Sequence, residues 1–247
     1  NDSMLEQISG CGNGNYAFID TYSEAKKVLL EQLSSTLITI AKDVKIQVEF
    51  NPALVASYRL IGYENRILDA EDFNDDKKDA GEIGAGHAVT ALYEIVPAGI
   101  EDPASRKIDP LKYQTPRDTL PAGNGDELMT VKLRYKHPES DSSEKLELAV
   151  SDQLTPFSKM DSEFQFAAAV ANFGLQLRKS DYRGNWTYSD IEAVARQAKG
   201  EDPHGFRDEF LQMVSVARSL STSTPTSPST DDHLMDHPAL PIGSTGL

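Results

Sequence analysis

The residues best suited to chemistry in this sequence form an acidic segment between residues 69 and 82. Clustered carboxylates on a loop suit Ca²⁺, a hard cation that takes many oxygen ligands. Asp72, Asp75 and Asp76 are the candidate metal ligands. The segment's carboxylates are Asp69, Glu71, Asp72, Asp75, Asp76, Asp79 and Glu82, and glycines stand at its end.

The match of this segment to a calcium-binding EF-hand loop fails after the opening residues. Lys77 stands where the turn requires glycine, and Ile83 stands where a bidentate glutamate belongs. The alternative to a metal site is a solvated connection, which we prefer. Its carboxylates would pair with Arg59, Arg66, Lys77 and Lys78.

Other catalytic signals are weak. His87 could act as a general base beside a carboxylate, but a histidine that hydrogen-bonds loop backbone is the more common arrangement. Cys11 lies between two glycines, which supply neither the base nor the positive charge that activates a thiol. No nucleophile elbow and no His-Glu-x-x-His zinc motif occurs. We therefore expect no catalytic residue and no enzyme activity.

Two further groupings have ordinary explanations. His233 and His237 have helical metal-ligand spacing, but they lie in a Ser/Thr/Pro-rich stretch, so we attribute the spacing to chance. Tyr182, Trp186 and Tyr188 surround a turn between two expected helices. They could form a partner-binding patch, but packing of the helix pair is the preferred interpretation.

Composition restricts the partners. The formal net charge is −15, which disfavours nucleic acid and anionic membrane surfaces and favours cations or basic proteins. The single cysteine excludes an intramolecular disulfide. No apolar run approaches the length of about 20 residues that a membrane helix needs. No signal peptide is visible, and we take the chain, which begins at Asn1, to be part of a longer protein.

Hydrophobic periodicity predicts which helices and strands carry the candidate residues. A helix over 3–9, a short strand over 15–19 and a helix from Thr21 or Ser23 to about Leu33 suggest an α/β layer. Strict alternation in Val44–Phe50 predicts a half-buried strand with Ile46 and Val48 in the core. Further strands are expected over 57–63, 88–96, 129–135 and 146–150, and helices over 162–179, 189–200 and 203–220. Ser189 and Glu192 are the expected capping box of the second of these helices.

The predicted fold class is α+β. Residues 1–35 form the terminal piece of an α/β domain, 36–155 an antiparallel β-sandwich and 156–220 a small helical subdomain. A Pro- and Gly-rich loop over 97–127 joins two strands, and the tail, 221–247, is expected to be disordered.

Several long runs resemble one family. Residues 1–20 resemble the end of a von Willebrand factor A domain, and the following stretch resembles the C-terminal region attached to A domains in YfbK-type bacterial proteins. The runs that carry the second resemblance are 40–52, 58–66, 71–87 and 89–95. The resemblance covers residues 1 to about 220. It implies adhesion or assembly rather than catalysis.

The resemblance also limits the expected cofactor. A domains hold Mg²⁺ or Ca²⁺ through an Asp-x-Ser-x-Ser loop, which does not occur in this chain; in the nearest match, which begins at Asp141, Lys145 replaces the second serine. A divalent cation is therefore expected in the A-domain portion upstream, and no cofactor is expected on this chain.

The leading interpretation is a non-enzymatic protein-interaction or scaffold module, with an unknown protein partner. Its parent is expected in the bacterial cell envelope, periplasmic or membrane-anchored, with a cytoplasmic location as the alternative. A first rival function is an assembly or chaperone-like factor for a metal-dependent complex, which the absence of a secretory signal in the parent would favour. A second is a hydrolase that uses the acidic segment and His87.

Overall fold

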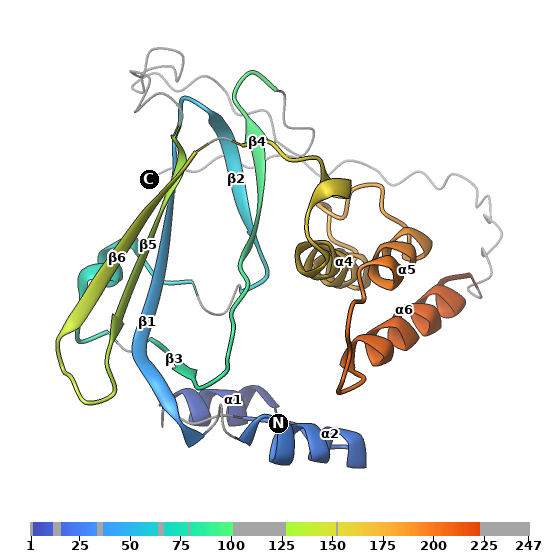
Figure 1. Ribbon diagram of the computed structural model, residues 1–247, viewed down its shortest axis with the longest axis horizontal. Coiled ribbons are helices and arrows are strands. Elements are labelled where there is room, and N and C mark those ends of the chain that lie inside the picture. The colour runs from blue at the N-terminus through green and yellow to red at the C-terminus, as the bar shows by residue number, and fades with distance from the viewer. Residues whose placement is uncertain are drawn as a thin grey trace, which may run out of the picture.

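The computed structural model describes residues 2–11, 16–33, 37–63, 67–78, 80–100, 127–151 and 153–222. Most of the predicted loop at 97–127 and of the tail lie outside these residues. The predicted α+β class is confirmed, because antiparallel sheets and separate helices make up the described chain (Figure 1). None of the described helices has both the length and the apolar character needed to cross a membrane.

The larger sheet has four antiparallel strands in the order β3-β1-β5-β6. These are β1 (Thr39–Phe50), β3 (Gly81–Gly84), β5 (Glu127–Lys136) and β6 (Ser143–Ser151). A hairpin whose connection runs over 137–142 joins β5 to β6, and their register pairs Leu133 with Leu146 and Val131 with Leu148. Residues opposite each other in an antiparallel pair share a face, so this register sets the two faces of the sheet.

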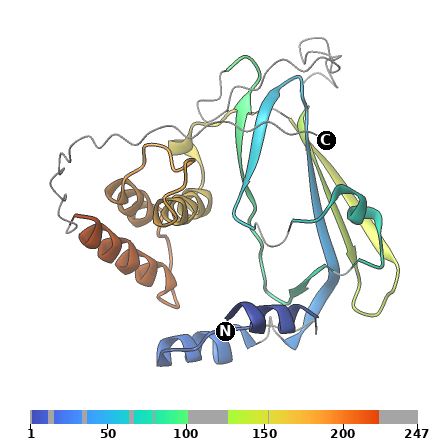
Figure 2. The same cartoon turned by 180° about the vertical axis from the view of Figure 1, so that it is seen from behind.

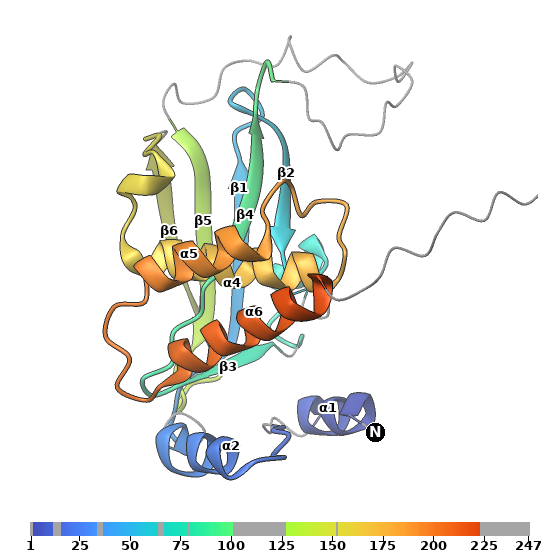
Figure 3. The ribbon, with the colours of Figure 1, turned by 90° about the vertical axis from the view of Figure 1, so that its right-hand side faces the viewer.

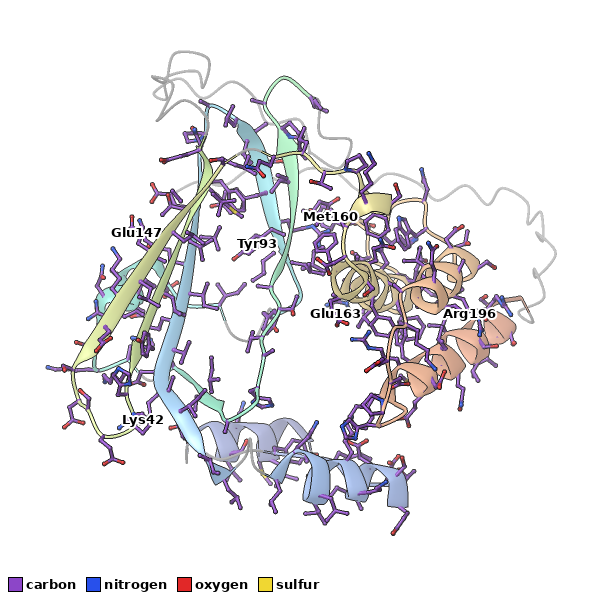
Figure 4. The ribbon with its side chains drawn as sticks, in the orientation of Figure 1. Lys42, Tyr93, Glu147, Met160, Glu163 and Arg196 are labelled. Carbon is purple, nitrogen blue, oxygen red and sulfur yellow. The ribbon has the colours of Figure 1, made fainter. Side chains whose placement is uncertain are left out.

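The smaller sheet consists of β2 (Val55–Ile61) and β4 (Leu92–Pro97), also antiparallel. It meets the larger sheet through aromatic rings: the ring of Phe50 lies 4.5 Å from that of Tyr58 and 5.4 Å from that of Tyr93. Figure 4 shows the Tyr93 side chain directed from β4 toward β1. The two sheets thus share a core at the Phe50 end of β1, which is narrower than the sandwich predicted from the sequence.

The alternation in β1 buries a different set of residues from the one predicted. Phe50 is buried, but Ile46 is 48% exposed and Lys45 is only 2% exposed. The prediction that Ile46 lies in the core is therefore wrong, while Val48 is half-buried. The alternation itself holds, because Ile46, Val48 and Phe50 share one face and Lys45 lies on the other. The error arises because the second sheet reaches only the Phe50 end of that face.

Three helices form the largest apolar core of the described chain. They are α4 (Ser162–Leu177), α5 (Tyr188–Gln197) and α6 (Phe206–Thr222), and they pack beside β2 and β4 (Figures 1 and 3). Ile191 and Val214 are fully buried between them. The last helix extends two residues into the range predicted to be disordered, and 223–247 lie outside the described residues.

Side-chain caps fix where these helices begin. Asp161 accepts a hydrogen bond from the Phe164 amide at 2.8 Å and caps α4. The capping box of α5 is Thr187 with Asp190, not the predicted Ser189 with Glu192. The prediction was wrong by two residues because Thr187 offers the same hydroxyl chemistry one half-turn earlier.

The Arg59 side chain connects the helices to the smaller sheet. Arg59 of β2 pairs with Glu94 of β4, and its guanidinium carbon lies 4.1 Å from the ring centroid of Tyr182, in the α4–α5 turn. A cation over an aromatic face is an attractive contact. The predicted packing of the aromatic turn on the helix pair is confirmed for Trp186 and Tyr188, which pack against the helical core. Tyr182 departs from the prediction, because its ring lies against Arg59 of β2.

The N-terminal elements lie at the lower end of the larger sheet in Figures 1 and 2. They are α1 (Asp2–Cys11), α2 (Tyr22–Lys26) and η1 (Lys27–Glu31), which continues α2 as a π-helical turn. Thr21 caps α2, as one of the two predicted caps. The strand predicted over 15–19 is not formed in its described part, 16–19, because a strand needs a neighbour to pair with and none of the described strands pairs there.

We expect Phe50→Ala to lower the free energy of unfolding by about 3–5 kcal/mol, because it empties the contact between the two sheets. Ile46→Ala, on the same face of the same strand, is the matched control and should cost about 1 kcal/mol or less. Urea unfolding of both variants measures the difference. Equal costs would contradict the position of the core.

Candidate functional site

The acidic segment lies against the outer side of the larger sheet, opposite the smaller sheet (Figures 1 and 2). It begins with a 3₁₀ turn, η3 (Ala70–Asn74), whose Phe73 side chain is buried. It ends in β3, an edge strand paired with β1 that the sequence did not predict because it is four residues long and contains two glycines. The segment is thus anchored by an apolar ring at one end and by strand pairing at the other.

Lys45 is the residue that fastens this segment to the sheet. Its side chain points away from the apolar face of β1, and its ammonium nitrogen donates hydrogen bonds to the carbonyl oxygens of Asp72 at 3.1 Å and Asp75 at 2.5 Å. Because the Lys45 residue is only 2% exposed, its ammonium group must be hydrogen-bonded to offset the hydration it has lost. The acidic segment therefore supplies backbone oxygens, rather than carboxylates, to the most buried charge.

Lys136 of β5 provides a second fastening point. Its ammonium nitrogen donates to Asp43 Oδ2 at 2.6 Å and to the carbonyl oxygen of Asp76 at 2.9 Å. The hydrogen bond to Asp43, together with the charge of that carboxylate, raises the pKa of Lys136 above its ordinary value. Through these two hydrogen bonds Lys136 joins β5 to β1 and to the acidic segment.

Asp43 occupies an irregular position in β1. Its φ is +50°, and the pairing of β1 with β5 shifts register between Lys42 and Lys45, as at a β-bulge. Burial alone would raise the pKa of the Asp43 carboxyl. The hydrogen bonds from Lys136 and from the Ala80 amide, with the nearby charges of Lys136 and Lys45, outweigh burial and lower the pKa below its ordinary value.

Asp76 joins three elements through its carboxylate. Its Oδ1 accepts hydrogen bonds from Ser143 Oγ at 2.8 Å and from the Arg134 guanidinium at 2.9 Å. These two hydrogen bonds, and the charges of Arg134 and Lys136, lower the pKa of Asp76. Because Ser143 begins β6 and Arg134 lies on β5, this carboxylate secures the end of the β5–β6 hairpin.

The three predicted metal ligands point to different partners. Asp72 pairs with Lys78 at 2.8 Å, Asp75 Oδ1 accepts from the Lys77 amide at 2.9 Å, and Asp76 binds Arg134 and Ser143. Among the described residues, no three His, Cys, Asp or Glu side chains form a group that could hold a metal ion. Of the predicted counterions, Lys78 takes that role, Arg59 pairs with Glu94 instead, and Arg66 lies outside the described residues.

The other candidate residues lie apart from this network. His87 is exposed in the turn after β3, where its backbone amide donates to the Gly84 carbonyl at 3.0 Å. Cys11 ends α1, and its side chain is outside the described residues, as are His233 and His237. The structure therefore does not assemble the predicted candidates into one site.

Sequence reasoning missed the basic half of the network. Lys45 and Lys136 stand at polar positions of alternating strands, a pattern that predicts exposed side chains. The acidic segment was visible as a cluster, but its partners on the sheet lie 27 to 67 residues away along the chain. The sequence signal that could have revealed these partners was the alternation of polar and apolar residues along β1 and β5. Once the two strands are paired, that alternation places Lys45 and Arg134 on one face.

We expect Lys45→Ala to lower the free energy of unfolding by about 1–3 kcal/mol, because two carbonyl oxygens lose their donor. Lys145→Ala is the matched control: this lysine lies on β6, on the same face of the sheet, and is exposed. Its removal should change stability by less than about 0.5 kcal/mol. A similar cost for both changes in chemical denaturation would show that Lys45 does not hold the segment.

The lowered pKa of Asp43 predicts a pH dependence. The stabilisation from its ionised form is complete above the unfolded pKa, near 3.8, and is lost as pH falls through the lower folded pKa. Asp43→Asn should reduce stability at neutral pH and flatten the decline below about pH 4. Urea unfolding at a series of pH values from neutral to acid measures both effects. Parallel curves for wild type and variant would contradict this origin of the acid sensitivity.

Comparison with known proteins gives this fold a family. Residues 35–220 match the family described as the C-terminal region of the uncharacterized protein YfbK. The chain is 43% identical over 221 residues to the uncharacterized protein YfbK of Escherichia coli (strain K12), a match covering 90% of this chain and 37% of that protein. No solved structure matches. The chain spans little more than a third of its relative's length, and it belongs to the YfbK C-terminal family.

Proposed function

We propose that this chain is a non-enzymatic protein-interaction or scaffold module of a bacterial von Willebrand factor A-domain protein, with its parent in the cell envelope. The observation that carries the proposal is an apolar face of the larger sheet that the described chain covers only at one end. Solvent-exposed apolar patches of this kind mark surfaces that contact other proteins.

The apolar face consists of three rows that run across β1, β5 and β6. The strand registers align Ile46 with Leu133 and Leu146, Val48 with Val131 and Leu148, and Phe50 with Met129 and Val150. Phe50 is covered by the smaller sheet, but Ile46 is 48%, Leu146 54% and Leu148 65% exposed. The opposite face is polar and carries the acidic segment, so only one face of this sheet offers an apolar docking surface.

The N-terminal elements support the A-domain part of the proposal. Apolar side chains in α1 and the segment after it are largely exposed, among them Met4 at 52%, Ile8 at 60%, Phe18 at 63% and Leu30 at 70%. In the proposal, residues 1–35 of this chain form the end of the A domain. The exposed apolar side chains then pack against the rest of that domain. The Ca²⁺ or Mg²⁺ of an A domain would then be held by that domain.

A binding role without catalysis is supported by the use the structure makes of its carboxylates. A hydrolase built on the acidic segment would need a carboxylate free to accept a proton beside His87. Asp72 and Asp76 instead hold Lys78 and Arg134 in ion pairs. The segment is thus occupied in fastening the sheet.

The test uses substitutions on opposite faces of β1 in the full-length protein, expressed in its own host. Ile46→Lys puts a charge on the apolar face, and Gln47→Lys, the next residue, puts the same charge on the polar face. We expect native gels of envelope extracts to show a high-molecular-weight complex for the wild type, which disappears with Ile46→Lys and persists with Gln47→Lys. Unchanged melting temperatures show that both variants fold.

A complex that survives both substitutions, or no complex in the wild type, would contradict the interaction role. Fractionation of the same cells tests the location, because the proposal requires the protein in the envelope fraction. Recovery in the cytosolic fraction would contradict that part alone.

A further inference from the structure

Strand β6 is the longer of the two edge strands of the larger sheet. Among the described strands it forms an outer edge of the larger sheet and pairs only with β5 (Figure 3). Residues 144–149 are exposed on both faces. Half of the backbone N–H and C=O groups of an edge strand point away from the sheet and can pair with another strand. The opposite edge, β3, has four residues, whereas β6 has nine.

The side chains of β6 alternate in character. Leu146 and Leu148 lie on the apolar face, and Lys145 and Glu147 lie on the polar face, where their charged groups are 2.9 Å apart. Figure 4 shows Glu147 on the outer side of the strand. The strand therefore carries one positive and one negative charge, two residues apart, on the same face.

We propose that β6 pairs with β6 of a second copy of this chain, antiparallel and centred on Leu146, to join two four-stranded sheets into one. In this register Leu146 lies opposite itself on the two-fold axis. Lys145 of each copy lies opposite Glu147 of the other, which makes two reciprocal ion pairs on the polar face. Leu148 lies opposite Glu144 of the other copy, so the apolar contact across the axis is the one between the two Leu146 side chains. This pairing does not depend on the proposed binding of another protein to that face.

Charge selects this register among the symmetric ones. Centring the pair on Lys145 or on Glu147 places like charges directly opposite each other, which destabilises an antiparallel pair. Centring it on Leu148 places Glu147 opposite Ala149 and forms no ion pair. Only the register centred on Leu146 pairs opposite charges at both positions. Backbone hydrogen bonds and leucine contacts provide the attraction, and the charges fix the alignment.

The first test is a charge swap followed by sedimentation velocity of the 247-residue chain over a range of concentrations. Lys145→Glu and Glu147→Lys should each raise the dimer dissociation constant about tenfold, since each converts two attractive pairs into two repulsive ones. The double variant restores both pairs and should return the dissociation constant to that of the wild type. The single changes move the net charge of −15 in opposite directions, so net charge cannot explain a loss in both.

The second test locates the axis by disulfide formation in a Cys11→Ser background. Leu146→Cys faces its own copy and should give a covalent dimer under oxidising conditions, since opposed side chains in an antiparallel pair come close enough for a disulfide. Leu148→Cys, on the same face of the same strand, is the matched control and should remain monomeric on a non-reducing gel. Melting temperatures of all variants check that the monomer is intact.

A wild-type chain that stays monomeric at all concentrations overturns the proposal. The role of Lys145 is then to keep the edge strand unpaired. A dimer that the double variant fails to restore overturns the register. Cross-linking through Leu148→Cys in place of Leu146→Cys also overturns the register.

Discussion

The burial of the Lys45 ammonium group constrains the rest of the sheet. A charge that is 2% exposed would be unstable without hydrogen-bond partners, and the carbonyl oxygens of Asp72 and Asp75 are the partners it has. The acidic segment must therefore cross the sheet where Lys45 emerges. Phe73 and the Asp76 contacts hold it there, so that a stretch rich in like charges becomes an ordered part of the fold.

This arrangement divides the larger sheet into two unlike faces. On the polar face, lysine and arginine side chains from β1 and β5 neutralise the acidic segment, and Asp43 at the bulge joins β1 to Lys136. On the other face, the smaller sheet covers Phe50 and leaves the rows ending in Leu146 and Leu148 exposed. The exposed apolar face, on which the proposed function rests, is thus the face that the charged network does not use.

The helical subdomain has its own core, which is closed by fully buried apolar residues. It contacts the smaller sheet where Arg59 lies over the ring of Tyr182. The described side chains of the N-terminal elements include none that is buried, and residues such as Ile8 and Leu30 are exposed. The two proposals on association therefore rest on the sheet of this YfbK-family chain, which has an exposed apolar face and an edge strand, β6, that pairs on one side among the described strands.

The sequence by itself determined the α+β class, five of the six described strands and the three C-terminal helices, because alternation and helical periodicity are local properties. It also located the acidic segment. Only the tertiary structure decided which face of β1 is covered, that Lys45 is buried and that Asp72, Asp75 and Asp76 point to separate partners. Those outcomes depend on pairing between residues far apart in the chain, and a one-dimensional pattern of polar and apolar residues carries no information about which distant partner satisfies a charge.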